Sequence, residues 1–122
     1  HSNDTTDTDY LKWILDQGCF LGLDRYPGIL VSPHMRTVTL KRLMDMGYAE
    51  RLCPSHDCIC LHIHNEQADG SIPAEHAFTA SNPDQYLYMH RHVIPELLQM
   101  GATQTDIDML FIDNPKRLFE GA

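Results

Sequence analysis

The 122-residue sequence has no long uninterrupted apolar run, and this absence argues against a membrane-spanning helix. A helix that crosses a bilayer needs about 20 consecutive apolar residues, and no stretch here approaches that length. The sequence also lacks a starting methionine and a basic segment followed by an apolar one. We therefore expect a processed or truncated start, no signal peptide and no membrane partner.

Positive charge and cysteine are scarce as well. The chain has 9 Lys and Arg residues against 17 Asp and Glu residues, a formal net charge of -8. Proteins that bind nucleic-acid backbones are usually basic, so we expect no nucleic-acid partner. Two of the 4 cysteines fall in predicted buried strands and the other two are separated by a single residue. This pattern disfavours a disulfide framework and favours a reducing, cytoplasmic location. In contrast, 8 histidines is a high count and points towards metal chemistry.

Short apolar segments alternate with stretches of helical periodicity. Residues 19–23 and 51–55 predict buried strands, and Pro54 predicts that strand pairing ends at or before it. Helical spacing is found in residues 10–15, 35–44, 86–100 and 107–111, with a last helical turn ending near residue 119. Pro95 either kinks its helix or begins a second one. Thr103 and Asn114 predict helix caps, and Trp13 is expected in the core.

Polar residues follow the predicted strands at the point where each strand ends. Asp24 and Arg25 follow the first strand, and Ser55-His56-Asp57 closes the second. Residues 1–4, with the sequence His-Ser-Asn-Asp, look like a third strand end without its strand. Polar residues at the carboxyl ends of successive parallel strands form the active sites of (β/α) barrels. Because so few parallel strands would leave exposed edges, we expect part of a larger barrel enzyme.

Taken in order, these motifs resemble the C-terminal part of the phosphotriesterase-related metal-dependent hydrolases of the amidohydrolase superfamily. The matching segments are residues 1–4, 22–25, 36 with 41–48, 55–57, 93–95 and 113–115. The resemblance covers essentially the whole chain. It implies an α/β fold made of about the last three units of an incomplete TIM (β/α)8 barrel. Residues 1–122 would then be a partial barrel domain, a fragment of a larger hydrolase domain.

The resemblance also implies a set of site residues. His1 and Asp57 would be ligands in a binuclear site, with Asp57 also accepting a proton from the bridging hydroxide. Two divalent metal ions, by expectation zinc, would acidify water and polarise the substrate oxygen. Asp4 and Arg25 match a proton relay, but arginine stays protonated, so Arg25 is expected to orient Asp57 or polarise substrate. Asp24 matches a carboxylate that fixes a ligating histidine.

Residues 58–83 show no period and predict a long functional loop. Together with Tyr26, the loop residues Cys58 and His76 are expected to contact substrate. The implied reaction is attack of a metal-activated hydroxide on a small-molecule ester, lactone or phosphoester. The Asp-Arg-Tyr sequence at 24–26 is similar to the lactonase-like branch of the family. For the complete enzyme we expect a cytoplasmic homodimer, and for this fragment alone no activity.

Other interpretations remain open at this point. Residues 58–64 carry cysteines and histidines at alternate positions, which suggests a non-enzymatic metal-binding module. Against it, successive side chains on one strand face are about 7 Å apart, too far for several to reach one ion. A catalytically dead interaction fragment is the third reading. For single residues the alternatives are a turn cap for Asp57, a disordered terminus for His1 and a surface ion pair for Arg25. The family's remaining ligands, a His-x-His pair and a bridging carboxylated lysine or acidic residue among them, have no counterpart in this chain.

Overall fold

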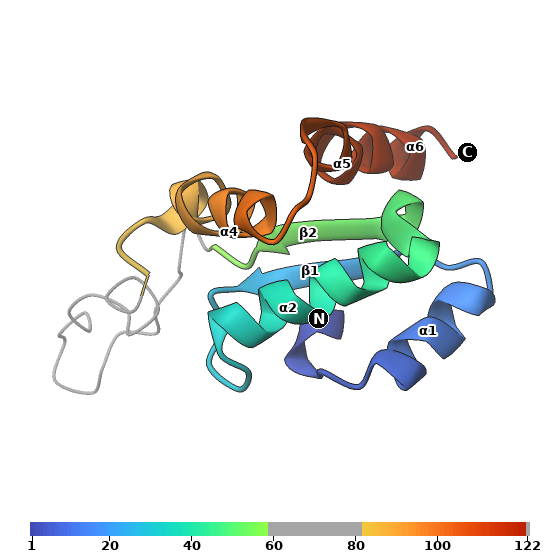
Figure 1. The fold of residues 1–122 in the computed structure, drawn as a ribbon, viewed down its shortest axis with the longest axis horizontal. Coiled ribbons are helices and arrows are strands. Elements are labelled where there is room, and N and C mark those ends of the chain that lie inside the picture. The colour runs from blue at the N-terminus through green and yellow to red at the C-terminus, as the bar shows by residue number, and fades with distance from the viewer. Residues whose placement is uncertain (59–81, 122) are drawn as a thin grey trace, which may run out of the picture.

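A two-stranded parallel sheet lies at the centre of the computed structural model, which describes residues 1–58 and 82–121 (Figure 1). Strand β1 spans Leu21–Tyr26 and β2 spans Leu52–His56. Leu21 is the register partner of Leu52, and Tyr26 that of His56. Parallel neighbours require a crossover connection, and helix α2 forms it here. The prediction of parallel β/α units is therefore confirmed.

Five α-helices surround the sheet in the described part of the chain. They are α1 (Thr8–Asp16), α2 (Pro33–Leu43), α4 (Ile94–Gln99), α5 (Gln104–Asp108) and α6 (Asn114–Glu120). Shorter 3-10 turns cover Ser2–Asp4, Ala49–Arg51 and Gln85–Leu87, and wider π turns cover Met44–Tyr48, Met89–Val93 and Met109–Asp113. Figure 1 shows α1 and α2 on the β1 side, and α4, α5 and α6 on the β2 side. Within residues 1–58 and 82–121, no helix has both the length and the apolar character that a membrane crossing requires.

Both strands extend further than the sequence predicts. Strand β1 starts at Leu21 and continues through Asp24 and Arg25 to Tyr26, so this polar pair belongs to the strand rather than to the loop after it. The prediction that pairing stops at Pro54 is wrong, because β2 continues to His56. The register is irregular between Leu23 and Tyr26, next to the position of Pro54. Proline has no N–H to donate to a neighbouring strand, and the ladder is irregular where that hydrogen bond is missing.

The core is built from leucines that the strands and helices contribute together. Leu11 and Leu15 lie one helical turn apart on the same face of α1, and both are buried. The full set of buried apolar residues is Leu11, Leu15, Leu21, Leu23, Tyr26, Leu40, Leu43, Met44, Leu52, Met89, Val93, Leu97, Ala102, Ile107 and Leu110. Trp13 is not among them: it is 61% exposed and stacks on Tyr10, so the expectation of a core tryptophan is wrong. Its position on α1 faces away from the stripe formed by the leucines.

The C-terminal half confirms one predicted cap and corrects another. Pro95 lies in the first turn of α4, which directly follows the Met89–Val93 π turn. Thr103 and Asp106 form the reciprocal cap at the start of α5. Asn114, expected as a helix cap, is instead buried and donates to the carbonyl oxygens of Ala49 at 2.7 Å and Leu52 at 2.8 Å. This side chain therefore attaches α6 to the start of β2.

Candidate active site at the carboxyl ends of the strands

Three segments far apart in the sequence meet at the carboxyl end of β1. The Ser2–Asp4 turn lies against β1, and the Asn3 side-chain oxygen accepts a 3.1 Å hydrogen bond from the backbone N–H of Arg25. Asp57 follows the end of β2, and its Oδ2 lies 3.6 Å from Nε of Arg25. The structure thus brings the predicted residues Asp4, Arg25 and Asp57 together.

Arg25 bridges the two carboxylates. Its Nη1 donates to Oδ2 of Asp4 at 2.5 Å, while its Nε faces Asp57. The 3.6 Å separation from Asp57 is an ion pair and too long for a hydrogen bond. Asp57 is the more exposed carboxylate, with 43% of its side chain accessible against 19% for Asp4. Arg25 is therefore held firmly on the Asp4 side and faces the accessible Asp57 on the other.

Arg36 of α2 is a second partner of Asp4, and no role for it was predicted from the sequence. Its Nη2 donates to Oδ1 of Asp4 at 2.7 Å, and its Nη1 donates to the carbonyl oxygen of Asn3 at 2.6 Å. A signal for its burial was present in the sequence. Arg36 precedes Leu40 and Leu43 by four and seven positions, so it lies on the apolar face of the helix. A charged residue on such a face is buried only when it is paired.

The two arginines change the acidity of Asp4. Burial raises the pKa of this carboxyl group, but hydrogen bonds and charge attraction from Arg36 and Arg25 outweigh burial and leave the pKa below its ordinary value. Both guanidinium groups favour the charged carboxylate. Asp4 is therefore an anion throughout the neutral pH range.

This lowered pKa predicts how Asp4 contributes to stability. A folded-state pKa below the unfolded value, about 3.9, gives stabilisation that is fully present above the unfolded pKa. The contribution is lost as the pH falls through the lower folded-state pKa. We expect Asp4→Asn to lower the free energy of unfolding at neutral pH and to reduce its decline in acid. Urea unfolding at a series of acidic pH values measures this; an acid decline as steep as that of the unsubstituted protein would contradict it.

His1 and Asp24 form the other contact expected at the site. Nδ1 of His1 lies 3.2 Å from Oδ1 of Asp24, with the side chains 49% and 40% exposed. A carboxylate at one ring nitrogen leaves the other ring nitrogen available, as in zinc-bound histidines. Among residues 1–58 and 82–121, no group of three or more His, Cys, Asp or Glu side chains is arranged to hold a metal ion. A complete metal site would therefore need further ligands from outside the described residues.

Of the three residues expected to contact substrate, Tyr26 is buried in the core, Cys58 lies near the site and His76 is outside the described residues. Tyr26 is predicted beside the site, but it is 2% exposed and belongs to the core. The reason is that β1 continues to residue 26, and the irregular register between Leu23 and Tyr26 shifts the alternation so that Tyr26 is buried like Leu21 and Leu23. Burial also raises the pKa of Tyr26, so its hydroxyl group stays protonated. Cys58 lies just after β2, and its carbonyl oxygen accepts a 3.4 Å hydrogen bond from the hydroxyl group of Tyr86. His76 and most of the 58–64 cluster lie outside the described residues.

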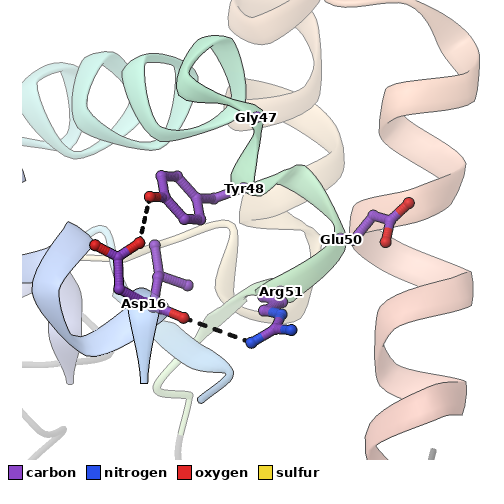
Figure 2. A pocket seen from close by; sticks show the side chains of 6 residues that line it. Asp16, Gly47, Tyr48, Glu50 and Arg51 are labelled. Atoms are coloured by element: carbon purple, nitrogen blue, oxygen red, sulfur yellow. Dashed lines mark hydrogen bonds between the residues drawn. The ribbon is translucent and has the colours of Figure 1, made fainter. Parts of the chain in front are cut away.

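A separate hollow of about 390 Å³ lies at the opposite, amino ends of the strands (Figure 2). It is lined by Leu15, Asp16, Gly47, Tyr48, Glu50 and Arg51. The Tyr48 hydroxyl donates to Oδ1 of Asp16 at 2.5 Å, and Nη1 of Arg51 donates to the carbonyl oxygen of Leu15 at 3.5 Å. These contacts connect α1 with the segment that leads into β2. Active sites of β/α barrels lie at the carboxyl ends, so this hollow fits a structural role.

Comparison with known proteins identifies relatives over nearly the whole chain. Residues 1–119 match the model of the phosphotriesterase family. A phosphotriesterase homology protein of Mycobacterium tuberculosis is 33% identical over 121 residues, covering 98% of this chain and 35% of that protein. An aryldialkylphosphatase of Saccharolobus solfataricus is 32% identical over 120 residues, covering 98% of this chain and 37% of that protein.

A solved structure agrees with these sequence matches. The phosphotriesterase from Mycobacterium tuberculosis superimposes with a TM-score of 0.81 and 34% sequence identity, covering 98% of this chain and 35% of that one. This likeness supports the expectation of an α/β fold that matches part of a TIM barrel. The chain spans about a third of the length of these relatives. The further expectation, that this third is the C-terminal part of the barrel, is not confirmed by the comparisons.

Proposed function

The chain belongs to the phosphotriesterase family, and we propose that it carries part of the active site of a metal-dependent hydrolase. Its substrates would be small esters, lactones or phosphoesters, and residues 1–122 would form a partial barrel domain. The contact of Asp57 with Arg25, which Asp4 holds in turn, is the observation that carries this proposal. It places an accessible carboxylate at the strand end where barrel enzymes have their catalytic groups.

Asp57 and His1 are the residues that would hold the metal ions. Carboxylate oxygen and imidazole nitrogen are ordinary zinc ligands, and we propose zinc for both positions. When bound, the ions would acidify a water molecule and polarise the substrate oxygen. Asp24 fixes the ring of His1 through Nδ1 and leaves Nε2 for metal binding. The donor types and the His1–Asp24 contact therefore fit a metal site.

Asp57 would also accept the proton of the attacking water. Arg25 cannot pass that proton onward, since a guanidinium group stays protonated at any pH of interest. Its charge, 3.6 Å from Oδ2 of Asp57, instead orients this carboxylate towards the substrate. Because 43% of the Asp57 side chain is exposed, its proton can leave directly to solvent. Asp4 acts behind Arg25 by holding the guanidinium group in place.

We also propose substrate contacts, a cellular location and an oligomeric state for the complete enzyme. Cys58 begins the segment that would contact substrate, and His76 lies further along it. The inclusion of lactones among the proposed substrates rests on the similarity of residues 24–26 to the lactonase-like branch. Cys19, Cys53 and Cys58 are free thiols, which suits a reducing cytoplasm, and we propose a homodimer for the complete enzyme. A separate metal-binding module at residues 58–64 is not favoured, because one family model spans residues 1–119.

Removal of the metal tests this proposal. We expect a chelator to abolish hydrolysis of a lactone, a phosphotriester and a carboxylic ester by the full-length protein. Addition of about two equivalents of zinc per active site should restore turnover, since both ions take part in the chemistry. The measurement is steady-state kinetics with metal content determined on the same samples. Undiminished turnover in metal-free protein, or no turnover of any of these substrates after reloading, would overturn the proposal.

A further inference from the structure

We propose that Arg36 is a positioning residue for Arg25: it holds Asp4 and Asn3 so that they fix Arg25 beside Asp57. Arg36 does not reach Asp57 and belongs to a different element, α2. The inference rests on the proposed function, because Arg25 matters only if Asp57 takes part in the reaction. It adds to that function a residue that acts on the reacting groups only through Asp4, Asn3 and Arg25.

The Arg36 side chain has no access to solvent, and all three of its nitrogen atoms donate. Nε donates to the carbonyl oxygen of Val31 at 2.9 Å, Nη1 to that of Asn3 at 2.6 Å and Nη2 to Oδ1 of Asp4 at 2.7 Å. A buried charge is tolerated only when it is paired and hydrogen-bonded, as it is here. The guanidinium fork is planar, so these contacts fix its orientation as well as its position.

Arg36 contacts both groups that hold Arg25. Oδ1 of Asp4 accepts a hydrogen bond from Arg36 and Oδ2 accepts one from Arg25. Because both oxygens are bonded, the carboxylate group cannot rotate freely. Asn3 accepts the backbone N–H of Arg25 on its side-chain oxygen and receives Arg36 on its carbonyl oxygen. Loss of the Arg36 contacts would therefore release the backbone support and the side-chain support of Arg25 together.

The loop after β1 leaves space for this guanidinium group. Gly28 has a φ of +67°, and a Cβ atom there would lie 2.2 Å from Nη2 of Arg36 and 2.6 Å from the carbonyl oxygen of Arg25. Contacts that short are impossible without displacement. Gly28→Ala therefore displaces Arg36 without altering Arg36, Asp4 or Asn3, but it also presses on the backbone of Arg25, so Arg36→Lys is the decisive variant.

Stability alone would not require an arginine at this position. Replacement of a buried ionic network by well-packed apolar residues is often neutral or stabilising. What an apolar residue cannot do is hold one oxygen of Asp4 while the other faces Arg25. The arrangement of donors thus agrees better with a role in orientation than with a role in folding alone.

The test compares three variants of the full-length, metal-loaded enzyme. Arg36→Lys keeps the charge but loses the fork, and Gly28→Ala displaces it. We expect each to lower kcat by about 10- to 100-fold, the range for groups that support metal-site residues, with little change in KM. Gly101→Ala is the matched control, because Gly101 has a φ of +89° and no atom within 4 Å of an added Cβ. Its kcat should stay that of the unsubstituted enzyme.

A double substitution and a crystal structure separate orientation from folding. In an Asp4→Asn background, Arg36→Lys should lower kcat much less than it does alone, because both act through the same contact. In the Arg36→Lys structure, Nε of Arg25 should move away from Oδ2 of Asp57, which it now faces at 3.6 Å. An Arg25 that keeps its place, or full and additive losses of kcat in both backgrounds, would overturn the inference. Lack of turnover by the unsubstituted enzyme would instead contradict the proposed function, and the crystal structure would still decide the role of Arg36.

Discussion

Replacement of Asp57 by asparagine in the full-length protein is expected to lower kcat by about two to four orders of magnitude, the range for a general acid-base group. Asparagine keeps the shape of the side chain but loses its charge and basicity. It can neither accept the proton from the attacking water nor bind a cation as a carboxylate does. Folding should be largely intact, since Asp57 follows the end of β2 and 43% of its side chain is exposed.

Steady-state kinetics on lactone, phosphotriester and ester substrates measures this effect. Asp45→Asn is the matched control: this exposed carboxylate pairs with Lys41 one helical turn away, a contact of small energetic value. Its turnover should equal that of the unsubstituted enzyme. Near-normal kcat for Asp57→Asn on the best substrate would remove Asp57 from the mechanism.

Leu97→Ala should lower the free energy of unfolding by about 2–5 kcal/mol, the usual cost of emptying a leucine site in a packed core. Leu97 lies on α4, is 0% exposed and belongs to the shared core. Its neighbour Leu98 is 42% exposed, so the same change there removes little buried surface. The two variants lose the same atoms from adjacent positions of one helix and differ in burial.

Denaturant unfolding of the full-length protein compares the two. We expect Leu98→Ala to cost less than about 1 kcal/mol, since surface substitutions seldom cost more. Equal losses at the two positions would mean that α4 does not bury Leu97 in the core as the structure shows. A larger loss for Leu98→Ala would mean that a partner surface covers it in the complete protein.

The sequence predicted best those features that depend on neighbours along the chain. The leucines of α1 recur at helical spacing, and the cap formed by Thr103 and Asp106 needs only residues three apart. The order of strand, helix and strand followed from the same local signals. These interactions are decided within one or two helical turns, so a single sequence contains the information.

Features that depend on distant neighbours were harder to predict. Asn114 has the residue type of a helix cap, and only the position of β2 turns its amide towards two carbonyl oxygens of another segment. Tyr26 follows two polar residues and resembles a loop residue, yet the ladder with β2 extends far enough to bury it. In the candidate site, the strand-end rule placed Arg25 and Asp57 at the same edge. The helical spacing indicated that Arg36 is buried, but its role was missed because its partners in the site, Asn3 and Asp4, lie more than thirty positions away.

The close packing of Gly28 against Arg36 limits how the two positions can change during evolution. A side chain at position 28 requires that the guanidinium group be absent or elsewhere, since an added Cβ atom would overlap Nη2 at 2.2 Å. A lineage that loses the glycine first passes through a protein with a displaced arginine. A lineage that loses the arginine first leaves Asp4 with a single cationic partner among the described residues. The two positions are therefore expected to covary among homologues, with glycine retained wherever the arginine is retained.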